Sequence, residues 1–160
     1  MKIAELLPEN GIITEVEASS KSELLRQISE ALAQCYPSLD ADEVFRVLME
    51  REQLGSTGVG DGIAIPHGKL PSDRFCSFSK PFPILLFARS LRGVDFDAMD
   101  SRPVYLIFAL IAPENCPGLH LKVLAKIARL LKNKEVQEKL LHAKSRREIL
   151  DIINQYDNGT

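Results

Sequence analysis

Cysteine is scarce in this 160-residue sequence, and the few cysteines present are unevenly spaced. They stand at Cys35, Cys76 and Cys116. An odd number without a repeating spacing does not make a disulfide framework, and the lack of a C-x-x-C pair argues against a thiol-based zinc or redox site. We therefore expect all three to be small buried or surface residues without a chemical role.

The sequence also lacks an excess of charge and a long apolar run. Lys and Arg number 20 against 22 Asp and Glu, a formal net charge of -2, whereas nucleic-acid binders usually carry a clustered basic face. The longest apolar run, 104–112, is far below the roughly 20 residues that span a bilayer. No apolar segment follows Lys2 as in a secretory signal. We expect a soluble, cytoplasmic protein that neither binds nucleic acid nor inserts into membranes.

Capping boxes, in which Ser, Thr or Asp precedes Glu by three positions, mark the starts of helices. Each box here is followed by apolar residues at helical spacing, which predicts three helices. The pairs are Ser20 with Glu23, Asp40 with Glu43, and Ser145 with Glu148. Pro37 stops the first of these helices. A longer helix is expected to begin just after Pro117 and Gly118, and a short one to cover 135–142.

The middle of the chain contains segments that are apolar at every position, a pattern typical of strands covered on both faces. The expected strands are 12–16, 63–65, 84–88 and 104–112. Helices lie toward both ends of the chain. The pattern predicts a single three-layer α/β domain over residues 1–160, with a central mixed sheet of about five strands flanked by helices.

The most informative segment is residues 55–68, GSTGVGDGIAIPHG. Glycine lets main-chain N–H groups approach an anion closely, and Ser56 and Thr57 add hydroxyl donors, so the segment resembles a phosphate-binding loop. A Walker loop would end in Lys followed by Ser or Thr. A dinucleotide fingerprint would follow a strand and open a helix, whereas here a helix precedes the glycines and a strand follows them. Nucleotide binding is therefore not expected.

His67 stands at the end of the strand into which this loop runs, and strand ends of α/β sheets commonly bind ligands. Pro66 fixes the approach of the chain, and Gly68 is expected to leave the far side of the histidine open. A neutral imidazole is a nucleophile near pH 7, and the phosphoramidate that it forms is labile enough for the group to be passed on. Considered alone, a loop histidine more often only hydrogen-bonds within a turn.

Two further residues are candidates for holding a phosphoryl group beside His67. Arg51, at the end of the second predicted helix, carries a planar guanidinium that can bind two phosphoryl oxygens at once; an exposed helix-end arginine is the alternative. His120 lies in the first turn of the long helix, where the dipole disfavours protonation and attracts anions; a surface capping histidine is the alternative. His142, at a helix C-terminus, is interpreted as structural or solvated.

Together these residues resemble a known signature. Arg51-Glu followed by residues 55–69 is similar to the active-site signature of the fructose/mannitol-type enzyme IIA domains of the bacterial phosphotransferase system. Residues 93–98, residues 104–113 and His120-Leu121 match later landmarks of the family in order. Within the family the chain is most similar to the stand-alone nitrogen-regulatory enzyme IIA, because it opens with MKIAELLP and shows no fused transporter or carrier domain.

The resemblance implies that His67 accepts a phosphoryl group from a histidine-phosphorylated carrier protein, with Arg51 and His120 flanking that group. Two roles remain open: a regulator whose phosphorylation changes its binding to target proteins, and a sugar-uptake component that passes phosphate to a IIB domain. The sequence departs from the family in a longer segment, 71–92, whose prolines and polar turns predict an extended surface loop before the strand at Ile84. Partner docking near His67 is therefore expected to differ from the family pattern.

Two metal-site hypotheses are disfavoured by the residues. The candidate calcium ligands are Asp95, Asp97 and Asp100. A calcium loop would need an oxygen ligand where Met99 stands and a glutamate where Leu106 stands, so a turn is favoured. A zinc hydrolase built on His67, His120 and Cys116 lacks a spaced ligand pair on one element. Neither a metal nor another cofactor is expected.

Overall fold

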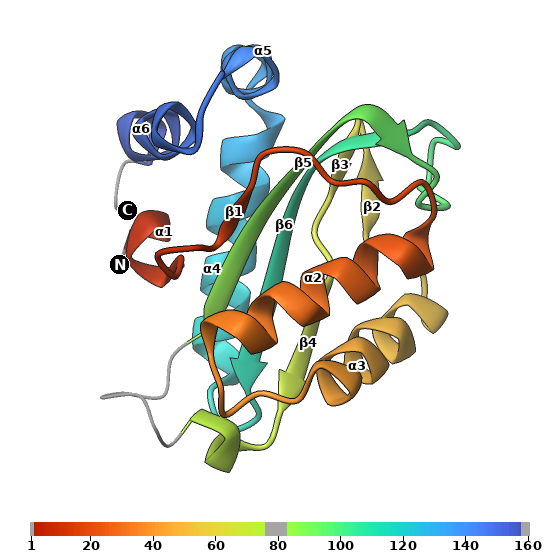
Figure 1. The fold of residues 1–160 in the computed structure, drawn as a ribbon, viewed down its shortest axis with the longest axis vertical. Coiled ribbons are helices and arrows are strands. Elements are labelled where there is room, and N and C mark those ends of the chain that lie inside the picture. The colour runs from red at the N-terminus through yellow and green to blue at the C-terminus, as the bar shows by residue number, and fades with distance from the viewer. Residues whose placement is uncertain (1, 76–82, 158–160) are drawn as a thin grey trace.

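The computed structural model describes residues 2–75 and 83–157, which form a six-stranded mixed sheet with helices on both faces (Figure 1). The helices are α1 (Ile3–Leu6), α2 (Lys21–Cys35), α3 (Ala41–Gln53), α4 (Pro117–Lys132), α5 (Lys134–His142) and α6 (Arg146–Tyr156), with a 3-10 helix, η1, at Ser72–Phe75. The strands are β1 (Ile12–Ile13), β2 (Gly58–Gly60), β3 (Ile63–Ala64), β4 (His67–Leu70), β5 (Ile84–Val94) and β6 (Val104–Pro113).

The strand order is β1-β5-β6-β3-β2, and β4 also pairs with β6. Strands β5 and β6 are antiparallel, whereas β3 and β4 both run parallel to β6. Their register is continuous, with Ala64 opposite Ile107 and His67 opposite Leu110. The carbonyl of Pro66 accepts the N–H of Leu110 at 3.0 Å. Because proline has no N–H to donate, the ladder is interrupted there, and β3 and β4 are two halves of one strand.

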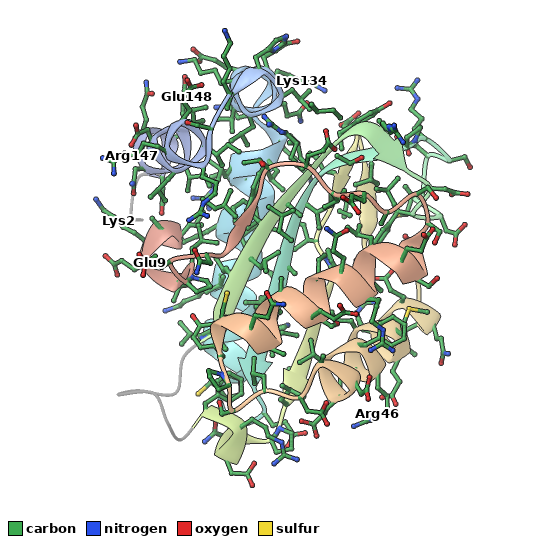
Figure 2. All side chains as sticks on the ribbon, in the orientation of Figure 1. Lys2, Glu9, Arg46, Lys134, Arg147 and Glu148 are labelled. Carbon is green, nitrogen blue, oxygen red and sulfur yellow. The ribbon has the colours of Figure 1, made fainter. Side chains whose placement is uncertain are left out.

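The two faces of the sheet carry separate cores, which explains why the strands are apolar at every position. In β5, Leu85 and Phe87 face the side of α1, α4, α5 and α6, whereas Leu86 and Ala88 face α2 and α3. The charged residues of α5 and α6 point outward, as Figure 2 shows for Lys134, Arg147 and Glu148. Side chains buried on both faces confirm the predicted three-layer α/β fold with a mixed central sheet.

The predicted helices are all present, but only two of the three predicted capping boxes form. Ser20 and Ser145 each accept the main-chain N–H three residues further on. Asp40 instead accepts the N–H two residues on, and its helix still starts as expected. The predicted partner, Glu43, is bound by the guanidinium of Arg74 through two hydrogen bonds of 2.9 and 3.0 Å. Because both oxygens of Glu43 bind Arg74, this carboxylate does not cap the start of α3.

Several element bounds differ from the prediction. Strand β5 continues beyond its apolar part to Val94, which pairs with Val104 on β6 after an irregularity that follows Arg89, and β1 is limited to Ile12–Ile13. Helix α4 begins at Pro117, slightly earlier than expected. Helix α1 and strands β2 and β4 were not predicted, since elements of three or four residues show no hydrophobic period.

Some predicted features fall outside the described residues, namely Cys76 and most of the extended loop expected before Ile84. Cys35 and Cys116 are free and partly buried. No helix within residues 2–75 and 83–157 is long and apolar enough to cross a bilayer.

A buried cation connects the N-terminal part of the chain to the C-terminal helices. Arg89 on β5 is only 5% exposed. Its Nε donates to the carbonyl of Thr14 at 2.9 Å, and its Nη1 donates to the carbonyls of Leu140 and Ala143 at 2.8 and 2.6 Å. The last two carbonyls lie at the C-terminal end of α5, where the helix dipole favours a positive charge.

We predict that Arg89→Met lowers the free energy of unfolding by at least about 2 kcal/mol, because it leaves buried carbonyls without donors. Urea denaturation of parent and variant measures the change. Arg92→Met, an exposed position on the same strand, serves as the control and should change stability by less than about 0.5 kcal/mol. Equal effects of the two substitutions would contradict the role given to Arg89.

Candidate active site

His67 lies at an edge of the sheet where the two helical layers meet. Within the described residues, β2 pairs only with β3, so the outer side of β4 has no neighbouring strand and α3 packs beside it (Figure 1). Side chains alternate along the strand: Ala64 and Leu70 belong to the α2–α3 core, and Ile63 and Ile65 to the core beneath α4. The alternation places the His67 side chain on the α4 side.

The hydrogen bonds of His67 fix its tautomer. Nδ1 lies 2.9 Å from the carbonyl oxygen of Ile65. A carbonyl can only accept, so Nδ1 carries the proton and Nε2 presents its lone pair. The Nε–H of Arg51 donates to that lone pair across 3.2 Å. Nε2 is therefore the nucleophilic nitrogen of this site.

Arg51 reaches His67 because α3 and β4 approach closely. A Cβ added at Gly68 would lie 3.1 Å from Cγ2 of Val47 on α3. The expectation that Gly68 leaves the far side of the histidine open is therefore wrong, since α3 fills that side. The guanidinium is held at a second point, where Nη1 donates to the carbonyl of Gly55 at 2.9 Å.

His120 approaches from the opposite layer, in the first turn of α4. Its ring centroid lies 5.4 Å from that of His67, with the planes inclined at 59°. The residue is 5% exposed, and its Nδ1 has no hydrogen-bond partner among the described residues. Unpaired buried polar atoms are rare and often mark functional sites. Because no neighbour binds Nδ1, the ring is not committed to one tautomer through that atom.

Both imidazoles are neutral at pH 7. Burial lowers the pKa of His67 below its ordinary value of 6.5; the hydrogen bond to Ile65 opposes this, and the charges of Arg51 and Lys69 add to it. Burial, with the charges of His67 and Lys69, lowers the pKa of His120 to about 4. A neutral His67 keeps its lone pair for attack, and a neutral His120 can donate one hydrogen bond.

A pocket of about 630 Å³ opens over this site. His67, His120 and Lys69 line it. Leu54 and Leu121 also line it, although these apolar side chains are 84% and 66% exposed. Exposed leucines beside a reactive group are typical of a surface that contacts another protein.

The glycine-rich loop does not form the predicted phosphate cradle. Residues 58–60 form β2, and the chain turns back into β3 through positive φ angles at Gly60 and Gly62. The hydroxyl of Ser56 donates to the carbonyl of Phe96 at 3.2 Å, and the hydroxyl of Thr57 donates to the carboxylate of Glu52. The pocket lining contains neither hydroxyl residue. Ser56 and Thr57, predicted to bind the phosphoryl group, are instead engaged in holding the loop.

Sequence reasoning missed Lys69, which follows His67 by two positions on β4 and therefore lies on the same side of the strand. The alternation of a strand would have identified it, but the segment after His67 was not predicted as a strand. Sequence reasoning also missed Glu52, a carboxylate that is only 7% exposed.

The remaining polar candidates have structural partners. Nδ1 of His142 lies 2.8 Å from the carbonyl of Glu138 on its own helix, in an exposed position. The carboxylate of Asp100 accepts the N–H groups of Asp61 and Arg102, as in the predicted turn. Nowhere in the part of the chain that the structure describes do three or more His, Cys, Asp or Glu side chains converge as metal ligands.

Comparison with known proteins assigns the family. Residues 5–156 match the family described as phosphoenolpyruvate-dependent sugar phosphotransferase system, EIIA 2. The chain belongs to this family. The resemblance stated from the sequence signature is thereby confirmed.

Individual relatives cover most of the chain. A nitrogen regulatory protein from Bradyrhizobium diazoefficiens is 39% identical over 153 residues, which is 96% of this chain and 95% of that protein. The crystal structure of nitrogen regulatory protein IIA-Ntr from Neisseria meningitidis has a TM-score of 0.83 and 38% identity, covering 94% and 98% of the two chains. A fructose-specific EIIABC component from Bacillus subtilis is 35% identical over 98% of this chain but only 24% of its own length.

We predict that the His120 ring titrates with a midpoint of about 4 and that Lys69→Gln raises the midpoints of both His67 and His120. Removing a nearby cation makes protonation of each imidazole less unfavourable, so both values move upward. Ring resonances followed by NMR as a function of pH measure them. Lys122→Gln, an exposed position on α4 outside the pocket, is the control. A His120 midpoint near 6.5 would show that the ring is open to water.

Proposed function

We propose that this chain is a histidine phosphocarrier that accepts a phosphoryl group on Nε2 of His67 from a histidine-phosphorylated carrier protein. One observation carries the proposal. Nε2 presents a lone pair at neutral pH, and a guanidinium donor already lies 3.2 Å from it. A buried second imidazole and a rim of exposed leucines complete a site suited to a protein-bound phosphoryl donor rather than to a small molecule.

The chemistry follows from the hydrogen bonds. The Nε2 lone pair attacks the phosphorus of the donor's phosphohistidine; a new P–N bond forms while the bond to the donor imidazole breaks and its electron pair returns to that ring. Nδ1 of His67 keeps its proton and its bond to Ile65 throughout. The Nε–H of Arg51 loses its acceptor when Nε2 is phosphorylated, so it is released to bind a phosphoryl oxygen.

His120 and Lys69 act on the charge of the transferred group. A neutral His120 donates a hydrogen bond to a phosphoryl oxygen without competing as a nucleophile, since only 5% of the residue is exposed to an incoming donor. Lys69 adds a positive charge at the same side of the strand and favours the anionic phosphoryl group. Both contributions are largest where charge develops during transfer, so they affect the rate more than the binding of the partner.

The regulatory role is the better supported of the two. Relatives called nitrogen regulatory protein match this chain along nearly their whole length, which favours a phosphorylation-dependent regulator acting on target proteins. The fructose-specific relative favours the alternative, transfer to a IIB domain in sugar uptake. Transfer of the phosphoryl group to a IIB domain within seconds would favour uptake. The cytoplasmic location and the domain bounds 1–160 stay predictions.

We predict that His67→Ala folds as the parent does but accepts no phosphoryl group. Incubation with the phosphorylated carrier protein, followed by mass spectrometry, measures incorporation, and NMR of the parent should show phosphate on Nε2. His142→Ala is the matched control and should incorporate phosphate at the parental level, because that exposed imidazole binds only its own helix. Full incorporation in His67→Ala would refute the assignment of the site.

His120 is expected to act on the transfer step rather than as the acceptor. We expect His120→Ala to become phosphorylated at His67 but to pass the group on about 10²–10³ times more slowly, the usual cost of removing one donor to developing charge. Single-turnover transfer from the phosphorylated variant to an acceptor protein measures the rate. Parental rates in both directions would show that His120 is only a capping residue.

A further inference from the structure

Glu52 is a buried carboxylate next to the arginine of the site. It follows Arg51 on α3, and successive helical side chains point about 100° apart, so it turns toward the interior. Its Oε1 lies 3.0 Å from Nζ of Lys21 and accepts the N–H of Thr57 at 3.1 Å. Its Oε2 accepts the hydroxyl of Thr57. Both oxygens are therefore satisfied, as a buried charge requires.

Thr57 connects the Glu52 carboxylate to His67 through the main chain of Ile65. The carbonyl of Thr57 accepts the N–H of Ile65 at 3.0 Å. The carbonyl of the same Ile65 accepts the Nδ1–H of His67 at 2.9 Å. A continuous series of hydrogen bonds therefore runs from the Glu52 carboxylate through Thr57 and Ile65 to Nδ1 of His67. The last of these bonds is the one that leaves the lone pair on Nε2.

The same pair also fixes the arginine. The turn between Glu52 and Thr57 is closed by the side-chain bonds described above and by the N–H of Gly55, which donates to the carbonyl of Glu52 at 3.0 Å. Gly55 has a φ of 145°, which side-chain-bearing residues rarely adopt. Its carbonyl, so oriented, receives Nη1 of Arg51 at 2.9 Å. The turn thereby determines where the guanidinium points.

We infer that Glu52 and Thr57 form a positioning pair that aligns the Arg51 guanidinium with Nε2 of His67. The inference rests on the proposed function for its consequence in phosphoryl transfer, but the alignment itself is a property of the unphosphorylated chain. It gives the Thr57 hydroxyl a role different from the phosphoryl contact expected from the sequence. The charge of Glu52 also acts on His67, whose pKa it raises against the effect of burial.

The test replaces the hydroxyl and then restores it. Thr57→Val keeps the shape of the side chain and removes the donor to Glu52, whereas Thr57→Ser keeps the donor. We expect Thr57→Val to lower the transfer rate at saturating donor by about tenfold to a hundredfold, as misplacement of reacting groups does, with the KM for the donor unchanged. Thr57→Ser should recover most of that rate. Ser90→Ala, which removes a buried hydroxyl that closes a turn on β5, is the control and should match the parent.

A second readout needs no phosphoryl donor. In ¹⁵N NMR of the unphosphorylated protein, His67 should be a single Nδ1–H tautomer in the parent and a mixture in Thr57→Val, and the Arg51 Nε–H resonance should lose its protection from exchange. Parental tautomer and parental rate in Thr57→Val would overturn the inference. If the parent accepts no phosphate while Thr57→Val still loses the tautomer, the proposed function fails and the positioning pair stands. Urea denaturation of each variant shows that both readouts come from folded protein.

Discussion

Strand β6 is the constraint on which the rest of the structure depends, because β5 pairs along one of its edges and β3 and β4 along the other. Its side chains serve two cores: Ile107 packs toward α2 and α3, and Phe108 toward α4. A slip of one residue against β6 would exchange these faces, so the register is strongly specified. That register places His67 opposite Leu110, directly after Pro66, whose missing N–H interrupts the hydrogen bonding between the strands.

The site exists because an edge strand lies between two helical layers. Arg51 comes from α3 on one face of the sheet and His120 from α4 on the other (Figure 1), and both reach His67 because its strand lies at the edge. Burial by the two layers keeps both imidazoles neutral. The packing that stabilises the fold therefore also prepares the nucleophile, since a protonated His67 would have no lone pair to offer.

The sequence allowed the fold class, five helices and the grouping of His67 with Arg51 and His120 to be predicted, because these depend on local periodicity, caps and a long signature. It did not allow the directions of short polar side chains to be predicted. Ser56 and Thr57 occupy a loop whose composition suits an anion, yet their hydroxyls bind Phe96 and Glu52. Those partners are set by tertiary packing, as is the loss of one capping box to an arginine 31 residues away.

The neighbours Arg51 and Glu52 lie in the same turn of α3 but point in different directions, one toward the pocket and the other into the fold. The guanidinium of Arg51 points to the pocket, where its donors can pass from a nitrogen lone pair to phosphoryl oxygens. The carboxylate of Glu52 points inward, where Lys21 and Thr57 hold it. A carboxylate facing the pocket would repel an incoming phosphoryl group, whereas a buried one contributes hydrogen bonds to the loop while Lys21 balances its charge. The order Arg-Glu at the end of α3 thus places the attractive charge outward and keeps the repulsive one inside the fold.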